Sequence, residues 1–168
     1  MHKSAYDNIN KYTEKYLKEF EGKGAKILDV GSMDVNGTLK PIFSKPGWEY
    51  VGVDIAKGKN VNVVLADPYK YPFPDDHFDA AVSSSCFEHD EMFWLTFKEV
   101  VRVVKSGGYF FLAAPFKDGI HRVPVDCWRF LPDGYKALCK WEPKATLIDS
   151  FIDDRPHRDC VGAFKIQK

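Results

Sequence analysis

The chain has 168 residues, 45% of them hydrophobic, and its 24 lysines and arginines balance 24 aspartates and glutamates. This length and apolar content suit one folded domain with a proper core. A formal charge of zero lacks the electrostatic excess of a protein that grips a phosphate backbone, so nucleic-acid substrates are disfavoured.

Cysteine spacing and hydropathy narrow the class of protein further. No two of the four cysteines form a Cys-x-x-Cys pair, which favours reduced thiols over a zinc ribbon or a disulfide framework. Residues 1–18 are polar and lack the apolar region of a signal peptide. No stretch approaches the roughly 18 apolar residues of a membrane span. We therefore expect a cytoplasmic protein without a membrane segment.

The hydrophobic pattern predicts strands that alternate with helices and loops. Helical spacing of apolar residues predicts helices over 4–20 and 91–104, and a third helix is predicted over 132–141. Short apolar runs predict strands over 26–30, 48–55, 61–66, 78–84, 109–114, 146–151 and 161–166. Such alternation is typical of a doubly wound α/β sheet with mostly parallel strands.

The connection between the second and third strands is short. Only about six residues, 56–61, are available for it, although a parallel crossover usually takes about a dozen. The chain must retrace about 17 Å of strand, and six extended residues reach roughly 20 Å. We expect a crossover with no helix, and a sheet face that is thinly covered there.

Three strands end in residues suited to binding a ligand, and in an open α/β sheet the ligand lies at the carboxyl ends of the strands. Gly31 ends the first strand, where the backbone can turn and the amides that follow can hold a carboxylate. Asp54 ends the second strand and can accept both hydroxyl protons of a ribose. Asp67 ends the third strand and can accept from an adenine amine. Together these positions predict an adenosine site with an amino-acid tail near Gly31.

At this point the chain resembles the class I S-adenosylmethionine-dependent methyltransferases. The resemblance rests on ILDVGS (27–32), GVDI (52–55), LAD (65–67), FPDDHFDAAVSSSCFEH (73–89) and VVRVVKSGGYFFLAAP (100–115). It implies S-adenosylmethionine as the cofactor. The cofactor-binding residues that it implies are Asp29, Gly31, Ser32, Met33, Asp54, Ile55, Ala66, Asp67, Ser84, Ser85 and Phe87.

The glycine-rich turn departs from the family pattern. Met33 and Val35 occupy positions where the family has further glycines, and the next glycine is Gly37. The fold expected is an α/β, doubly wound, Rossmann-like sheet of about seven strands, with an antiparallel C-terminal strand. We expect one domain over 1–168, comprising an N-terminal helix (1–22), a cofactor-binding core (26–115) and a substrate loop with C-terminal strands (116–168).

Two segments are predicted to face the methyl acceptor, residues 88–90 and the loop 121–130. His121 is the first candidate for a general base, because an imidazole titrates near neutral pH. His89 is the second, with a capping or packing role as its alternative. The substrate-contacting candidates are Arg122, Asp126, Trp128 and Arg129. The alternative for this loop is structural, with Asp126 paired to Arg129 and Trp128 packed.

A metal ion is not predicted, although one alternative remains open. Some methyltransferases of small-RNA ends and of quinone biosynthesis carry Glu-x-x-Glu-His at this position, where it holds a divalent ion. Here the matching residues are Ser85, Glu88 and His89, so the first carboxylate is missing. The alternative ligand set is Glu88, His89 and His121.

The sequence therefore predicts methyl transfer from S-adenosylmethionine to a small molecule, through oxygen in preference to nitrogen or carbon. The alternatives are a non-catalytic module that acts with a partner protein and, third, a nucleic-acid methyltransferase. The chain has little extra mass for a substrate lid. We expect either a small substrate or a pocket completed by a second subunit, as in a homodimer, or by a partner protein.

Overall fold

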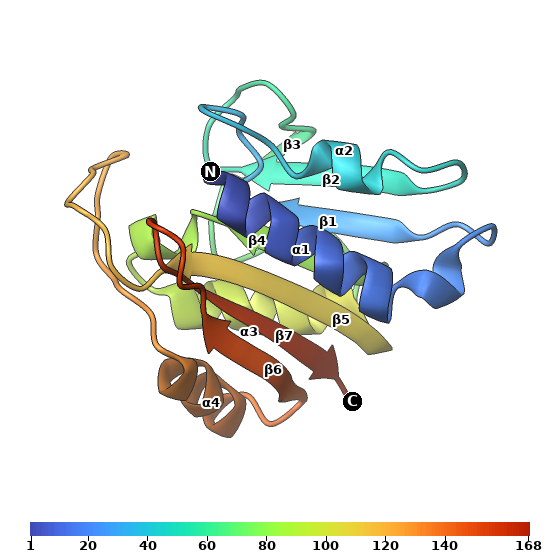
Figure 1. The fold of residues 1–168 in the computed structure, drawn as a ribbon. Coiled ribbons are helices and arrows are strands. Elements are labelled where there is room, and N and C mark those ends of the chain that lie inside the picture. Colours follow the sequence, from blue (N-terminus) through green and yellow to red (C-terminus); the bar gives the residue numbers. More distant parts are fainter.

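The computed structural model describes residues 1–168, whose strands form one seven-stranded sheet in the order β3-β2-β1-β4-β5-β7-β6 (Figure 1). The strands are β1 (Lys26–Val30), β2 (Glu49–Asp54), β3 (Val63–Val64), β4 (Phe78–Ser84), β5 (Val104–Pro115), β6 (Ala145–Ile152) and β7 (Asp159–Ile166). Strands β1 to β5 pair in parallel, whereas β7 is antiparallel to both β5 and β6. The predicted α/β class with an antiparallel C-terminal strand is confirmed.

Helices cover the sheet on both faces. They are α1 (Lys3–Tyr16), α2 (Lys40–Phe43), α3 (Phe93–Val103) and α4 (Pro132–Trp141), with 3₁₀ turns η1 (Lys18–Phe20) and η2 (Phe87–His89). Figure 1 shows α1 crossing one face, with α3 and α4 on the other side. None of these helices is long and apolar enough to cross a bilayer.

The central strands explain why the core has two halves. Alternate side chains of a strand point to opposite faces, and those of β4 are buried on both. Ala80 and Val82 pack in the cluster that contains Ile9 of α1. Ala81 packs in the cluster that contains residues of α3, and Phe78 joins the same cluster because the register shifts between Phe78 and Ala80. A strand buried on both faces reads as the continuous apolar run seen in the sequence.

The strands β3 and β5 differ from their predicted bounds. Strand β3 pairs over two residues only, Val63 with Val53 and Val64 with Asp54. Strand β5 begins directly after α3, because Val104 already pairs with Phe78 before the register shifts to Tyr109 with Ala80. Residues 105–108 lie between these two pairs. The connection from β2 to β3 contains no helix, as predicted.

Candidate active site

A cavity of about 620 Å³ lies at the carboxyl ends of β2, β1 and β4, which are neighbours in the sheet. This volume is within the usual range for sites that bind a cofactor or a drug-sized ligand. Eleven residues singled out in the sequence line it: Asp29, Gly31, Ser32, Met33, Asp54, Ile55, Ser84, Ser85, Glu88, His89 and His121. The structure thus brings together residues from three strand ends and from the loop after β5.

Gly31 turns the chain at the end of β1. Its φ is +73°, and a Cβ built there would lie 2.4 Å from the Cβ and Sγ of Cys86. Only glycine meets both requirements, the backbone conformation and the close approach. The glycine predicted at this turn therefore has a packing reason as well as a conformational one.

The amides after Gly31 do not have the predicted role. The amides of Gly31 and Ser32 both donate to the carbonyl oxygen of Val53, at 3.0 and 3.1 Å, and the Met33 amide donates to Asp54 Oδ2 at 3.1 Å. No helix follows this turn directly, since α2 begins only at Lys40. The expectation that these amides stay free for a ligand's carboxylate is wrong, because the sheet and Asp54 already engage them.

Asp29 is a buried carboxyl group in the cavity wall, with 3% of its surface exposed. The hydroxyl of Tyr50 donates to its Oδ2 at 2.6 Å. Burial raises the pKa of Asp29 to about 7, against the lowering effect of this hydrogen bond. Tyr50 was not identified from the sequence, because its position depends on the register that sets Asp29 opposite Gly52.

Asp54 is half-buried at the end of β2 and lines the cavity. Its Oδ2 accepts from the Met33 amide, and its Oδ1 accepts from the Ala56 amide at 3.3 Å. Two backbone donors therefore fix the orientation of this carboxylate. Each oxygen retains accepting capacity for a further donor such as a hydroxyl group.

Three predicted cofactor residues lie elsewhere. Ala66 and Asp67 are exposed and do not line the cavity, because the chain turns outward after β3 and Asp67 Oδ1 accepts from the Tyr69 amide at 2.9 Å. Phe87 is fully buried in the core, 5.8 Å from the ring of Phe110. From this region Leu65, Pro68 and Tyr69 line the cavity instead.

Glu88, His89 and His121 form a compact group in the cavity wall. Glu88 Oε1 lies 3.7 Å from Nε2 of His89 and 3.8 Å from Nε2 of His121. The Glu88 side chain is 1% exposed, and burial raises its pKa to about 7. The two predicted bases are thus brought together, from η2 and from the loop after β5.

The loop between β5 and α4 reaches the cavity, but not through the predicted substrate residues. The side chains of Asp126 and Arg129 form a two-point ion pair, at 2.6 and 2.9 Å. Trp128 packs against Phe93, and its Nε1 donates to the carbonyl of Asp90. Arg122 is exposed. These contacts match the alternative in which the loop is structural, with Asp126 paired to Arg129 and Trp128 packed. Residues 123–125 of the loop line the cavity instead.

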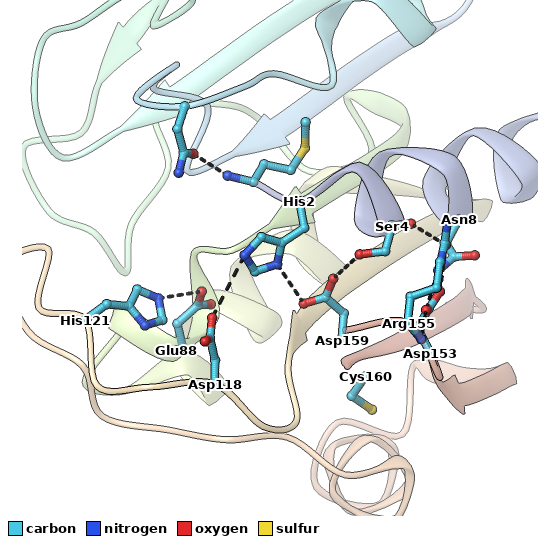
Figure 2. A network of polar contacts seen from close by, with 12 residues as sticks. His2, Ser4, Asn8, Glu88, Asp118, His121, Asp153, Arg155, Asp159 and Cys160 are labelled. Carbon is cyan, nitrogen blue, oxygen red and sulfur yellow. Dashed lines mark hydrogen bonds and ion pairs between the residues drawn. The ribbon is translucent and has the colours of Figure 1, made fainter. Parts of the chain in front are cut away.

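The N-terminal residues were not identified from the sequence. Met1 and His2 line the cavity, and the His2 ring stacks on that of His157 with 3.6 Å between centroids. Figure 2 shows His2 between Asp118 and Asp159, beside the His121 and Glu88 pair. The sequence pattern around His2 does not indicate that this residue lies in the wall of a cavity.

Comparison with known proteins places this site in a family. The family model described as a methyltransferase domain matches residues 28–112. A tRNA (carboxymethyluridine(34)-5-O)-methyltransferase of Arabidopsis thaliana is 26% identical over 77% of this chain and 30% of its own length. A demethylmenaquinone methyltransferase of Symbiobacterium thermophilum is 29% identical over 88% of this chain and 65% of its own length. The chain spans less than two thirds of the length of these relatives.

Solved structures share the fold at low sequence identity. The Burkholderia thailandensis 1,6-didemethyltoxoflavin-N1-methyltransferase, solved with 1,6-didemethyltoxoflavin and S-adenosylhomocysteine, superposes with a TM-score of 0.76 at 17% identity, covering 98% of this chain and 79% of its own. A Haloferax volcanii protein described as a putative methyltransferase, solved with the Trm112 methyltransferase activator, gives 0.67 at 15% identity, with 98% and 96% covered. The family match over the strands that form the cavity and the shared fold agree, and the chain belongs to the methyltransferase domain family, as its resemblance to the class I S-adenosylmethionine-dependent enzymes predicted.

Proposed function

We propose that this chain binds S-adenosylmethionine in the cavity at the ends of β2, β1 and β4 and transfers its methyl group to an oxygen of a small molecule. We further propose that residues 1–168 act as one domain, in which residues 26–115 carry the cofactor and 116–168 contribute to the acceptor side. Family membership supports the reaction class. The position of Asp54 in the cavity carries the proposal of a cofactor site.

Asp54 has the chemistry that a ribose requires. Its carboxylate lies at the carboxyl end of β2, the part of an α/β sheet where nucleotide ligands bind. Two amides hold it in place, so a pair of ribose hydroxyls would meet an acceptor that is already oriented. A carboxylate that served only as a cap would not need to open on a cavity of this volume.

The other end of the cavity supports an oxygen acceptor. Methyl transfer breaks the bond between sulfur and the methyl carbon, and the electron pair stays on sulfur. A bond forms from the acceptor oxygen to the methyl carbon, and the hydroxyl proton must leave. His121 and His89, with Glu88 between their Nε2 atoms, are groups that can take that proton. The remaining requirement is alignment of the two reactants, which binding of both in one cavity provides.

The zero net charge supports a small acceptor, since it offers no general attraction for a polyanion. We also propose that a second subunit or a partner protein completes the acceptor end of the pocket.

Calorimetry with S-adenosylmethionine and S-adenosylhomocysteine tests the proposal. Wild type should bind both, and Asp54→Asn should weaken binding by about tenfold or more, because one charge-assisted hydrogen bond contributes about 1.5–3 kcal/mol. Asp133→Asn is the control, because Asp133 is an exposed carboxylate on α4, away from the cavity wall. Absence of wild-type binding would overturn the proposal.

Radiolabelled S-adenosylmethionine separates catalysis from binding alone. The protein is incubated with a panel of small molecules that offer a hydroxyl, an amine or a carbon acceptor. We expect the label to be transferred to the hydroxyl compounds. Cofactor binding without transfer to any acceptor, in the presence of candidate partner proteins as well, would favour the non-catalytic module. Transfer to RNA alone would favour the nucleic-acid alternative.

A further inference from the structure

Glu88, His89 and His121 place three metal-binding atoms at one point of the cavity wall. One oxygen and two imidazole nitrogens lie within 4.8 Å of one another. The two His rings stand nearly perpendicular, at 88°, with centroids 5.0 Å apart. Around a tetrahedral ion with bonds of about 2.0–2.2 Å, ligand atoms are separated by about 3.4 Å. Small side-chain rotations would therefore bring these three atoms to binding distance.

Backbone carbonyls fix which nitrogen of each ring is free. Nδ1 of His89 lies 2.6 Å from the carbonyl oxygen of Val125, and Nδ1 of His121 lies 2.9 Å from that of Gly119. A carbonyl oxygen only accepts, so each Nδ1 carries the hydrogen and each Nε2 of the neutral ring keeps its lone pair. Metal-binding histidines are held in this way by a hydrogen bond to the other ring nitrogen.

The side chain of Glu88 is buried, but one of its two oxygens has no hydrogen-bond partner. Its side chain is 1% exposed, and its Oε2 has no hydrogen-bond partner. When both rings are neutral, the Nε2 atoms that face Oε1 carry no hydrogen, so the group then contains three acceptors and no donor. A buried carboxylate without a partner is strongly destabilising, and a cation would relieve it.

The main chain holds the two contributing segments together. The amides of Cys127 and Trp128 donate to the carbonyl oxygen of Glu88, at 2.7 and 3.2 Å. The His121 amide donates to Asp126 Oδ2 at 2.7 Å, and Asp126 is in turn held by Arg129. The η2 turn and the loop after β5 therefore keep a fixed spacing across the group.

We propose that Glu88, His89 and His121 bind one divalent transition-metal ion, of the zinc, manganese, iron or cobalt class, at the acceptor end of the cavity. Two nitrogens and one carboxylate oxygen suit these ions, whereas magnesium and calcium favour oxygen ligands throughout. Three protein ligands leave coordination positions open towards the cavity.

The inference rests on the proposed function and names the acceptor more closely, as a hydroxyl compound that reaches the ion through oxygen. The ion would lower the pKa of that hydroxyl, and the proton would pass to water. His89 and His121 would then act through the ion and would not take the proton themselves.

Direct metal binding tests this inference without an activity assay. Protein freed of metal by a chelator is titrated with Co²⁺, followed by visible absorption, and with Zn²⁺, followed by calorimetry. We expect one ion per chain. Glu88→Gln and His121→Asn should each weaken binding by at least about tenfold, since even groups that only support a metal ligand change affinity 10–100-fold. Because the His121 ring is 39% exposed, its variant should fold even if Glu88→Gln does not.

The chain offers a matched control in a second group of possible ligands, His2, Asp118 and His157. His157→Asn and Asp118→Asn should leave the affinity unchanged. No stoichiometric binding by wild type, or loss of binding in these controls instead, would overturn the inference.

Titration of the same samples with S-adenosylmethionine distinguishes the two proposals. Cofactor binding without metal binding would overturn the metal site alone. Metal binding without cofactor binding would overturn the proposed function and leave the metal-binding group in place.

Discussion

The side chain of Cys86 occupies the space that a side chain at position 31 would need. A Cβ on Gly31 would lie 2.4 Å from both Cβ and Sγ of Cys86, and φ at Gly31 is +73°. The contact joins the end of β1 to the residues after β4, in the wall of the cavity. We expect Gly31→Ala to lower the free energy of unfolding by about 2–5 kcal/mol, through backbone strain and overpacking.

Gly107 supplies the control for that substitution. Its φ is +83°, and a Cβ there would meet nothing within 4 Å. Gly107→Ala should therefore show the backbone effect alone, about 1–2 kcal/mol. Urea unfolding of both variants measures the difference. Equal losses at the two positions would contradict a steric role for Cys86.

Asp29 should make stability depend on pH. Its pKa is raised to about 7 by burial, whereas in the unfolded chain it is near the ordinary value of about 4. Between these two values the unfolded chain loses the proton while the folded chain keeps it, so wild type loses stability as pH rises. Relative to Asp29→Asn, the loss should approach about 4 kcal/mol at pH 7 and stay level above it.

Unfolding of wild type and Asp29→Asn at a series of pH values between 4 and 8 gives this difference directly. The comparison cancels other titrating groups, and asparagine can still accept from the Tyr50 hydroxyl. Asp133→Asn, at an exposed carboxylate, should show no such trend. A difference that stays constant from pH 4 to 7 would mean that Asp29 is ionised throughout.

The ion pair of Asp126 and Arg129 should stabilise the loop that carries His121. Both residues use two atoms, at 2.6 and 2.9 Å, and the Asp126 side chain is 1% exposed. Arg129 holds the pKa of Asp126 well below its usual range. Asp126→Asn should therefore lower stability by about 2–3 kcal/mol, because it removes a charge-assisted pair.

A second pair at the same spacing is the reference for this effect. Lys136 and Asp133 also lie three positions apart, but their side chains are 63% and 88% exposed. Asp133→Asn should change stability by no more than about 0.5 kcal/mol, as is usual for exposed pairs. Similar losses in the two variants, measured by urea unfolding, would show that the loop does not depend on its ion pair.

Arg155 should fasten α1 to the end of β6. Figure 2 shows Arg155 beside Asp153 and the residues of α1. Its guanidinium donates to Asp7 Oδ2 at 2.9 Å, to the Ser4 carbonyl at 3.1 Å and to Asp153 at 2.7 Å. Arg155→Ala should speed hydrogen exchange in α1, because opening of that helix then breaks fewer contacts.

Lys3 provides the comparison, since it also binds Asp7 but is 86% exposed and lies on α1 itself. Lys3→Ala should leave exchange in α1 nearly unchanged. If exchange is equally fast in both variants, the charge on Asp7 matters and the link to β6 does not.

Local patterns predicted the fold well because they record burial directly. The strand and the helix predicted over 78–84 and 132–141 have the observed boundaries of β4 and α4, Phe78–Ser84 and Pro132–Trp141. The length of β3 was overestimated, because residues 61–66 have strand-like composition but only two of them find a partner in β2. Pairing at a sheet edge depends on the path of the neighbouring chain, which composition does not record.

Only part of the site was predicted, because composition does not record the path that the chain takes beyond a strand. Asp54 and Asp67 look alike in sequence, each an acid at a strand end, yet Asp54 lines the cavity and Asp67 is exposed. The direction of the chain after each strand decides this. The approach of His121 to Glu88 joins segments more than thirty positions apart, and it depends on the loop that Asp126 and Arg129 hold.

The two chain ends lie at opposite ends of the parallel strands (Figure 1). Met1 lines the cavity at the carboxyl ends of these strands, whereas the Lys168 amide donates to the hydroxyl of Ser106 near the start of β5. A tag or fluorescent protein fused ahead of Met1 would begin in the cavity wall and compete with ligands for space. Fusion after Lys168 leaves the cavity open, and immobilisation through that end would present it to solution.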